Sequence, residues 1–269
     1  MNKVNYLFAA LWQDYVDRLS PSAGKVHQLL SNGDELINDH IALRTFNLPK
    51  VGLQVLAAPF LAIGYKACDT YDFEAKKLKA QHFEHPDPNA PLVFISELLV
   101  EELSVETQKI IHSLVGQVPA HYFATSDFLS SGRPWALRFE EYQTLAKESE
   151  YASWLAAHGY GANHFTVYVN QLEEFAEVVD VNQYLRDSGF AMNEIGGEVK
   201  GSPEVYLEQS STMADKVAVS FIEGEFDIPG GFYEFAKRYE LPNGKIYTGF
   251  VAASADKIFE STDGYILNI

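Results

Sequence analysis

Several components that define large classes of proteins are scarce in this chain of 269 residues. The single cysteine, Cys68, excludes an internal disulfide, so we expect a reducing compartment and a buried thiol. Lysine and arginine total 20 against 37 acidic residues, and the net charge of −17 repels nucleic acid and anionic membranes, although local arginines could still hold a small anion. No stretch is long and apolar enough to span a bilayer. The expected partners are small molecules, with no nucleic acid and no membrane.

The opening of the chain lacks the features of a secretory signal peptide. MNKVNYLFAALWQDY carries one lysine and a short apolar run, which Gln13 and Asp14 interrupt at helical spacing. We therefore expect an amphipathic first helix and a cytoplasmic location, and we leave the oligomeric state open. A phosphate-binding loop and a nucleophile elbow are also missing. The glycines of GYGANH follow no predicted strand, so dinucleotide binding is not supported.

Apolar periodicity predicts one order of elements twice: a strand, a helix and three further strands. In the first half, DHIALRTF is followed by a helix within residues 51–64 and by three strands between 65 and 100. In the second half, NHFTVYVN is followed by a helix that ends at Gly189 and by strands in VYLEQSST, KVAVSFIEGEF and GFYEFAKRYE. The sequences of the two halves barely resemble each other, so only the pattern repeats.

Helices are predicted around this repeat. Two lie within residues 3–31, an insert at about 101–160 ends at Gly159, and a short helix lies in ADKIFEST. The predicted fold is α+β, with paired βαβββ halves at about 38–100 and 162–250 that form a half-barrel sheet. We expect residues 1–269 to be a single domain.

Two predicted strands, DHIALRTF and NHFTVYVN, begin with a polar residue followed by a histidine. Alternate residues of a strand share a face. His40 and Arg44 therefore point to one side of the first strand, as His164, Thr166 and Tyr168 do on the second. The other side of the second strand is apolar. We expect that side to pack under helices and the polar side to face a functional site.

A carboxylate completes the pattern, because Glu234 is an acid among the aromatic residues of GFYEFAKR. Two histidines and one carboxylate from three strands would form a facial triad with open metal positions, which suits non-haem Fe(II) oxygen chemistry. Each residue alone is more often structural, either a hydrogen-bonded histidine or a glutamate paired with Arg238 or Lys237. The equivalent place of both histidines favours a metal triad of His40, His164 and Glu234.

These residues carry a resemblance to known families. A paired βαβββ pattern with a histidine on the first strand of each half resembles the vicinal-oxygen-chelate superfamily, and FYEFAKR is similar to the glutamate-bearing strand of the 4-hydroxyphenylpyruvate dioxygenase group. In this order, DHIALRTF, HPDPNAPLVFISEL, NHFTVYVN, GFYEFAKR and GFVAASADKIFEST resemble the 2-oxoadipate dioxygenase/decarboxylase family. The ordered set is fairly specific, although no single element is.

The resemblance implies that the triad binds Fe(II), that Arg44 holds the far carboxylate of the substrate and that Ser254 assists. It implies molecular oxygen as co-substrate and a 2-oxo dicarboxylic acid that is decarboxylated and hydroxylated, as in the conversion of 2-oxoadipate to 2-hydroxyglutarate. Two departures leave the 2-oxo acid open: the chain is shorter than many bacterial members, and Ala253 is smaller than the side chain expected there. The predicted substrate-binding residues are Arg44, Thr166, Tyr168, Ala253 and Ser254.

The position of Arg44 agrees with this role on independent grounds. His40 and Arg44 lie four residues apart on one strand face, so their Cα atoms are roughly 13 Å apart at about 3.3 Å per residue. Both side chains reach inward, and the remaining gap fits a short dicarboxylate held at both ends. The planar guanidinium suits a carboxylate. A surface or structural ion pair is the alternative for Arg44.

Other polar residues have no firm role in the sequence. His82 and His85 are predicted on opposite faces of a strand, so a joint metal site is not expected, and His85 is expected to cap a turn. Glu97 is either close to the site or part of a core network. Trp135 and Arg138 either line a pocket or only pack.

Two other functions are weighed against the dioxygenase. Redox-silent isomerases, lyases and hydrolases on the same scaffold usually have a fourth protein ligand, and no equally well placed one stands out. A non-catalytic binding protein with this fold has no need of the complete set of two histidines, a glutamate and an arginine.

Overall fold

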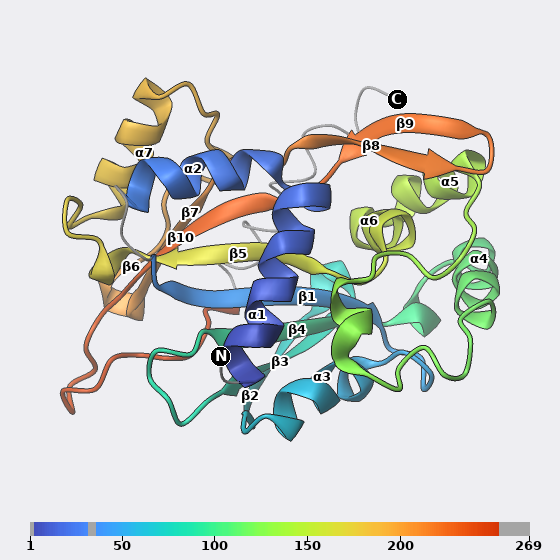
Figure 1. The fold of residues 1–269 in the computed structure, drawn as a ribbon, viewed down its shortest axis with the longest axis horizontal. Coiled ribbons are helices and arrows are strands. Elements are labelled where there is room, and N and C mark those ends of the chain that lie inside the picture. Colours follow the sequence, from blue (N-terminus) through green and yellow to red (C-terminus); the bar gives the residue numbers. More distant parts are fainter. Residues whose placement is uncertain (1–2, 32–35, 253–269) are drawn as a thin grey trace.

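The computed structural model describes residues 3–31 and 36–252, so Ala253, Ser254 and the helix predicted in ADKIFEST lie outside the described residues. Eight strands form one sheet in the order β2-β3-β4-β1-β5-β10-β7-β6 (Figure 1). The strands of this sheet are β1 (Asn38–Phe46), β2 (Lys66–Phe73), β3 (Leu78–Glu84), β4 (Leu92–Leu98), β5 (Ala162–Tyr168), β6 (Lys200–Ser202), β7 (Leu207–Ser211) and β10 (Phe232–Arg238).

The two halves of the sheet have the same topology. In the first half β4 pairs with β1 in parallel, and in the second half β10 pairs with β5 in parallel. β1 and β5 pair antiparallel at the centre and join the halves. A helix follows the first strand of each half, so the paired βαβββ fold predicted from the sequence is confirmed.

The described helices largely follow the predicted pattern. Two helical segments lie within residues 3–31, although a π-helix separates them at Tyr15–Leu19, and Pro21 opens the second as expected. The α-helices are α1 (Lys3–Asp14), α2 (Pro21–Ser31), α3 (Leu53–Ala62), α4 (Val105–Gly116), α5 (Phe139–Glu148), α6 (Glu150–His158) and α7 (Val178–Asp187). The π-helix is η1, and the short 3-10 helices are η2 (Glu74–Lys76), η3 (Val100–Glu102), η4 (Ser126–Ser130), η5 (Val169–Gln171) and η6 (Pro203–Val205).

One predicted strand is wrong. The stretch KVAVSFIEGEF is not a single strand of the main sheet but a hairpin of β8 (Lys216–Phe221) and β9 (Gly224–Pro229), which forms a sheet of its own. Gly224 has φ 145°, a conformation that favours glycine, and it allows the tight turn that the strand prediction read through. The remaining strand of the second half is β6, whose three residues are too few for an alternating pattern.

Two predicted helices have different limits in the structure. The stretch from 139 to 158 is broken at Ser149, whose hydroxyl accepts a hydrogen bond from the Ala152 N–H and caps a new helix. Gly159 ends α6 with φ 66°, as predicted. In the second half α7 begins only at Val178 and ends just before Gly189.

The sheet has one face under the N-terminal helices, and α1 runs across the strands in Figure 1. Phe165 on β5 packs against Trp12 and Tyr15, with ring centroids 5.0 and 5.1 Å apart. Because neighbours in a strand point to opposite faces, His164 and Thr166 must project from the other side of the sheet. The apolar face therefore holds the core, and the polar face is left for the candidate site.

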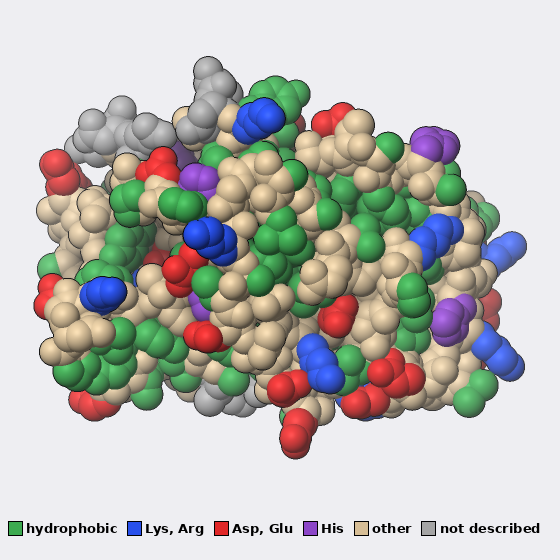
Figure 2. All heavy atoms as spheres, turned by 90° about the horizontal axis from the view of Figure 1, so that it is seen from below, with side chains coloured by type: hydrophobic (Ala, Val, Ile, Leu, Met, Phe, Trp, Pro, Cys, Tyr) green, Lys and Arg blue, Asp and Glu red, His purple; other side chains and the backbone are tan. Residues whose placement is uncertain are grey.

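The described surface agrees with the composition. In Figure 2 basic and acidic side chains are interspersed among hydrophobic ones on the face shown, with no gathering of basic residues. Among residues 3–31 and 36–252, no helix has the length and apolar character needed to cross a bilayer.

Candidate metal centre

The three triad residues meet on the three central strands of the sheet. His40 on β1 lies opposite Thr166 on β5, and Glu234 on β10 lies opposite the same threonine from the other side. His164 is two residues before Thr166 and projects from the same face. All three triad side chains are buried. Neighbouring strands thus bring together residues that lie far apart in the sequence.

The ligand atoms of the triad converge on one point. His40 Nε2 lies 3.4 Å from His164 Nε2 and 3.6 Å from Glu234 Oε1, and His164 Nε2 lies 3.2 Å from Glu234 Oε2. Bonds of about 2.0–2.2 Å to a shared ion would separate adjacent ligand atoms by roughly 3.0–3.5 Å. Among the described residues, Glu234 Oε2 accepts no hydrogen bond although it is buried. The donor set and its spacing therefore fit a divalent metal ion.

A β-bulge precedes each histidine and orients its ring. Asp39 and Asn163 are the extra residues at the two register shifts between β1 and β5. Asp39 Oδ1 lies 2.7 Å from His40 Nδ1, and Asn163 Oδ1 lies 3.1 Å from His164 Nδ1. Each oxygen can accept the Nδ1–H, which leaves the Nε2 lone pair toward the centre. Each histidine is thus oriented by the residue before it, with its Nε2 toward the other triad residues.

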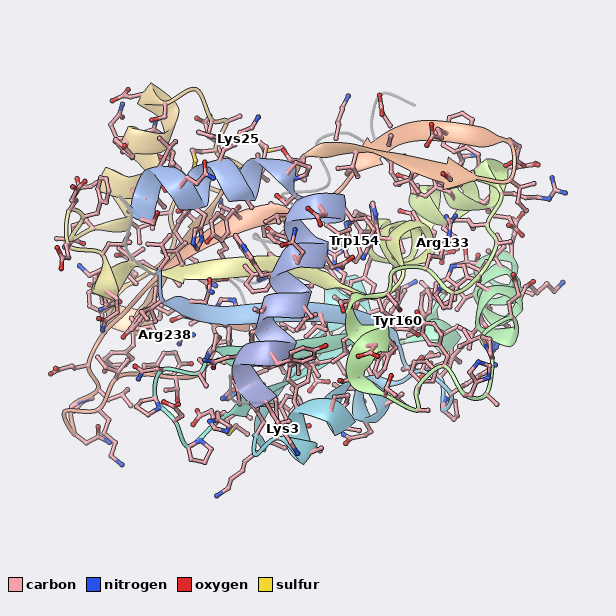
Figure 3. All side chains as sticks on the ribbon, viewed as in Figure 1. Lys3, Lys25, Arg133, Trp154, Tyr160 and Arg238 are labelled. Carbon is pink, nitrogen blue, oxygen red and sulfur yellow. The ribbon has the colours of Figure 1, made fainter. Side chains whose placement is uncertain are left out.

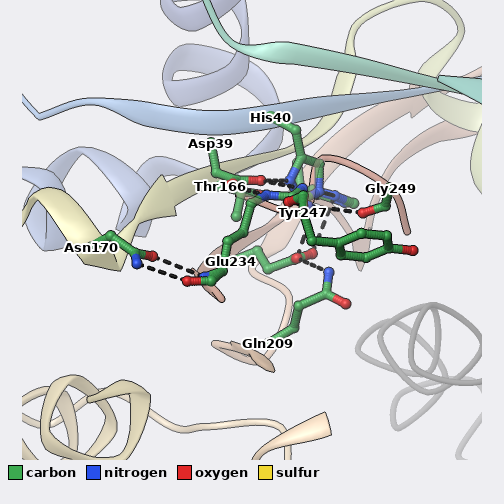
Figure 4. A network of polar contacts seen from close by, with 10 residues as sticks. Asp39, His40, Thr166, Asn170, Gln209, Glu234, Tyr247 and Gly249 are labelled. Atoms are coloured by element: carbon green, nitrogen blue, oxygen red, sulfur yellow. Dashed lines mark hydrogen bonds and ion pairs between the residues drawn. The ribbon is translucent and has the colours of Figure 1, made fainter. Parts of the chain in front are cut away.

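Asp39 also forms a buried ion pair with Arg238. Arg238 Nε and Nη2 donate to the two Asp39 oxygens at 2.6 and 2.8 Å, and Arg238 Nη1 donates to the Tyr247 and Gly249 carbonyls (Figure 4). Burial alone would raise the pKa of Asp39, but the charge and hydrogen bonds of Arg238 and His40 hold it well below its usual range. Asp39 is therefore an anion beside His40.

The remaining groups of the triad lie in a dry environment. Burial, together with the charges of His40 and Arg44, lowers the pKa of His164 well below its ordinary value, so its ring is neutral. Burial raises the pKa of Glu234, and the charge of His40 and the hydrogen bond from Gln209 partly offset this rise. Gln209 Nε2 donates to Glu234 Oε1 at 2.6 Å.

The structural alternatives for Glu234 are wrong. Arg238 pairs with Asp39, and Lys237 lies on the opposite strand face and pairs with Glu177. No described ion pair joins Glu234 to either cation, whereas its two oxygens lie 3.6 Å from His40 Nε2 and 3.2 Å from His164 Nε2.

An aromatic wall closes one side of the centre. The ring of Phe250 lies 4.8 Å from the ring of His40 and 4.8 Å from that of Phe94. The Phe250 N–H donates to the Tyr71 hydroxyl at 3.1 Å, which fixes this segment against β2. The ring also lies under the Arg238 guanidinium. These contacts hold Phe250 against His40 and Arg238, on the Asp39 side of the triad.

Arg44 lies on the site face of β1, near α6. Its Nη1 donates to Glu150 Oε1 at 2.9 Å, and its guanidinium carbon lies 4.8 and 4.9 Å from the ring centroids of Tyr151 and Trp154. Trp154 and Arg238 are seen toward opposite ends of the sheet in Figure 3. The Arg44 charge contributes to the low pKa of His164, so it acts electrostatically on the triad. The ion pair weighed as an alternative for Arg44 is present and does not exclude substrate binding.

The other sequence candidates divide into near and distant residues. Thr166 Oγ1 lies 3.2 Å from His40 Nε2, within the centre. Tyr168 lies at the end of β5 opposite Ala236, and burial together with the charge of Asp39 raises the pKa of its hydroxyl. Ala253 and Ser254 lie outside the described residues.

Most residues without a firm role in the sequence make structural contacts. Glu97 accepts the Leu53 N–H at the start of α3, and Trp135 donates to the Ala156 carbonyl. His85 Nδ1 accepts the Asp87 N–H, so the predicted turn cap is confirmed. Arg138 is exposed and pairs with Glu223. The expectation that Cys68 is buried is wrong, because β2 is an edge strand and leaves the thiol partly exposed.

Sequence reasoning missed three residues of the centre: Asp39, Asn163 and Gln209. Strict alternation places Asp39 and Asn163 on the face opposite their histidines, and only the bulges bring them to the rings. The polar residue before each histidine was the available signal. Gln209 lies in a predicted strand, but its distance in sequence from Glu234 gave no reason to pair them.

The sequence matches a known family over nearly all of its described length. The model of a family described as 2-oxoadipate dioxygenase/decarboxylase matches residues 4–121 and 124–245. A chloroplastic 2-oxoadipate dioxygenase/decarboxylase from Arabidopsis thaliana is 37% identical over 279 residues, which cover 92% of this chain and 74% of the relative.

Two solved structures are similar in both sequence and fold. Hydroxyglutarate synthase from Oryza sativa, crystallised with 2-oxoadipate, has a TM-score of 0.88 and 33% identity, with 98% of this chain and 93% of that chain covered. A protein from Shewanella frigidimarina with a provisional hydrolase name has a TM-score of 0.90 and 61% identity, with 93% and 98% covered.

Proposed function

The chain belongs to the 2-oxoadipate dioxygenase/decarboxylase family, and from this we propose that it is an Fe(II)-dependent enzyme that uses oxygen to decarboxylate and hydroxylate a 2-oxo dicarboxylic acid. Conversion of 2-oxoadipate to 2-hydroxyglutarate is the reaction proposed. The observation that carries the proposal is the convergence of His40, His164 and Glu234 within 3.6 Å of one another.

The triad would hold the metal through His40 Nε2, His164 Nε2 and a Glu234 oxygen. Three protein ligands would leave positions on the metal for the substrate and for oxygen. Fe(II), when bound, supplies the oxygen activation and the redox chemistry that no side chain of this chain can supply. The protein's own contribution is to keep the His164 ring neutral, to bring the three ligand atoms to one point and to pack Phe250 and Phe94 beside His40.

Arg44 is proposed to bind the far carboxylate of the substrate. Tyr151 and Trp154 support the guanidinium from α6, and Glu150 accepts a hydrogen bond from Nη1. A guanidinium has five N–H donors, so a substrate carboxylate can be bound beside Glu150. The distance along β1 from His40 suits a short dicarboxylate whose 2-oxo acid end lies at the metal.

Oxygen uptake tests the proposal. Anaerobically prepared Fe(II) protein is mixed with 2-oxoadipate, and we expect oxygen consumption matched by release of carbon dioxide. His40→Ala should abolish both, whereas His112→Ala, an exposed histidine on α4, serves as the matched control and should leave them unchanged. Absence of uptake with every 2-oxo acid in metal-loaded protein would favour a redox-silent reaction such as hydrolysis.

The role of Arg44 is tested with a pair of substrates. 2-Oxohexanoate has the chain length of 2-oxoadipate but ends in a methyl group. Arg44→Ala should lower kcat/KM for 2-oxoadipate on the order of 100-fold, because a charge-assisted hydrogen-bonded pair is lost, and should leave 2-oxohexanoate nearly unaffected. An equal loss for both substrates would assign Arg44 to structure through Glu150 alone.

Two further properties are proposed from composition and topology. Both halves of the sheet contribute ligands, so we propose that residues 1–269 act as one unit. A cytoplasmic location is proposed from the single cysteine and the acidic composition, although the Arabidopsis relative is named as chloroplastic.

A further inference from the structure

A second group of metal-ligating side chains lies at the edge of the sheet. Cys68 on β2 and His82 and Glu84 on β3 each offer one ligand atom, and these atoms all lie within 4.8 Å of one another. The group shares no residue with the triad of His40, His164 and Glu234. Its donor atoms are a sulfur, a nitrogen and an oxygen.

Local strand geometry brings these three side chains together. His82 and Glu84 are two residues apart on β3, so they point to one face. The pairing of β2 with β3 shifts between Ala67 and Thr70, which leaves one extra residue on β2 opposite His82. Such a bulge changes the direction of a side chain on an edge strand. Here it places Cys68 beside His82 and Glu84.

The His82 ring is held as metal-binding histidines are held. It is buried, and its Nδ1 lies 2.9 Å from the Tyr71 hydroxyl, which also accepts the Phe250 N–H. Its Nε2 points to Glu84 Oε1 at 3.3 Å. Histidine ligands are typically fixed through the ring nitrogen that does not bind the metal. Tyr71 provides that contact and leaves Nε2 toward Cys68 and Glu84.

We propose that Cys68, His82 and Glu84 form a second metal site, for a divalent cation of the Zn²⁺ class. A thiolate, an imidazole and a carboxylate together suit Zn²⁺ better than the harder Mg²⁺ or Ca²⁺. The cation would replace the thiol proton and keep one position for water. Partial burial and the charge of Glu84 raise the pKa of Cys68.

Phe250 lies between the two centres. Its ring centroid lies 5.6 Å from that of His82 and 4.8 Å from that of His40. A cation held by Cys68 and His82 would join edge strand β2 to β3 and fix Tyr71, which holds the Phe250 backbone. The site would therefore stabilise the wall of the triad and need not take part in catalysis.

Cobalt titration tests this site separately from the triad. The full chain with His164→Ala and Glu234→Ala has lost two triad ligands, and it is titrated with Co²⁺ in the absence of reductant. Because Cys68 is the only cysteine in the 269 residues, a sulfur-to-cobalt charge-transfer band in the near ultraviolet reports this thiolate alone. We expect the band to saturate at one equivalent and to disappear when Zn²⁺ is added.

Single substitutions define the ligands. Cys68→Ser should abolish the band, and His82→Gln and Glu84→Gln should each weaken cobalt binding by more than about tenfold, whereas Tyr71→Phe should weaken it by about tenfold. Asp72→Asn, an exposed residue on the same strand, is the matched control and should change nothing. Circular dichroism confirms that each variant is folded.

Two results would overturn the site. One is the absence of a charge-transfer band at stoichiometric Co²⁺ in a folded chain. The other is a band that persists at full affinity in both His82→Gln and Glu84→Gln, which would show that cobalt binds to the thiolate without the cluster. Neither result depends on whether the triad binds iron or turns over a 2-oxo acid.

Discussion

The two histidines of the triad occupy equivalent places in the two halves, yet residues of different charge orient them. His40 is held by Asp39, an anion that is itself paired with Arg238. His164 is held by Asn163, a neutral amide. The backbone device is the same in both halves, since each orienting residue occupies a β-bulge between β1 and β5. The two halves therefore share the bulge that orients the histidine, but they differ in the charge of the residue in that bulge.

This difference has a consequence for the metal. A carboxylate on Nδ1–H makes the opposite nitrogen more electron-rich than an amide does, so His40 should be the stronger ligand. The carboxylate requires a buried cation, which is Arg238. Arg238 in turn binds the backbone at Tyr247 and Gly249, beside the aromatic wall. Asp39 thus connects His40, through Arg238, to strand β10 of the second half and to the aromatic wall. Asn163, in contrast, contacts the ring of its neighbour His164.

The largest effect is expected from removing the charge at Asp39. Asp39→Asn keeps an oxygen for the His40 Nδ1–H but leaves Arg238 as a buried charge without its anion, which should lower the free energy of unfolding by about 3–5 kcal/mol. Urea denaturation measures it. The double variant Asp39→Asn/Arg238→Gln should recover part of the loss, and a single variant as stable as the native chain would show that the pair is dispensable.

Another buried histidine, His158 on α6, extends the comparison to a ring that is hydrogen-bonded to the Pro229 carbonyl. Burial lowers its pKa to about 3 from an ordinary 6.5, so below pH 6.5 the unfolded chain binds a proton that the folded chain does not. Stability should therefore fall with falling pH, by up to about 1.4 kcal/mol per unit from this residue. The slope between pH 6 and 4.5 should be smaller in His158→Gln, and equal slopes would contradict the assignment.

A smaller effect is expected at Asn163, the neutral residue that orients His164. Asn163→Ala removes the oxygen beside His164 Nδ1 and frees the ring to rotate, which should weaken metal binding by about 10–100-fold. Competition with a chelator measures the affinity, and the unfolding curve should shift less than in Asp39→Asn. A larger loss of stability than in Asp39→Asn would reverse the comparison.

The smallest effect is expected at Thr166, which lies beside His40 Nε2 at 3.2 Å. In the absence of metal its hydroxyl can donate to this nitrogen and so competes with the ion. Thr166→Val keeps the shape and removes the competing hydrogen bond, worth about 1 kcal/mol, so metal affinity should rise by up to about fivefold. Weaker binding in Thr166→Val would indicate that the hydroxyl supports the bound ion.

Strand alternation predicted the triad because β1 is regular from His40 onward, β5 is regular from His164 onward and β10 is regular around Glu234. It failed where regularity ends. Bulges moved Asp39, Asn163 and Cys68 to faces that alternation does not assign. The turn at Gly224 was hidden inside an apolar run and made a hairpin resemble one strand. Contacts such as Gln209 with Glu234 arise from strand order, which a single sequence does not contain.

The triad stands on the middle of the sheet rather than on loops. Amide protons of such central strands exchange with solvent only when the whole molecule unfolds, so the backbone around His40 should be among the slowest to exchange. An ion held by three side chains can leave by rotation of those side chains while every strand stays paired. Metal binding should therefore be reversible in the folded protein and depend on the free metal concentration. One protein molecule should bind and release many metal ions without unfolding.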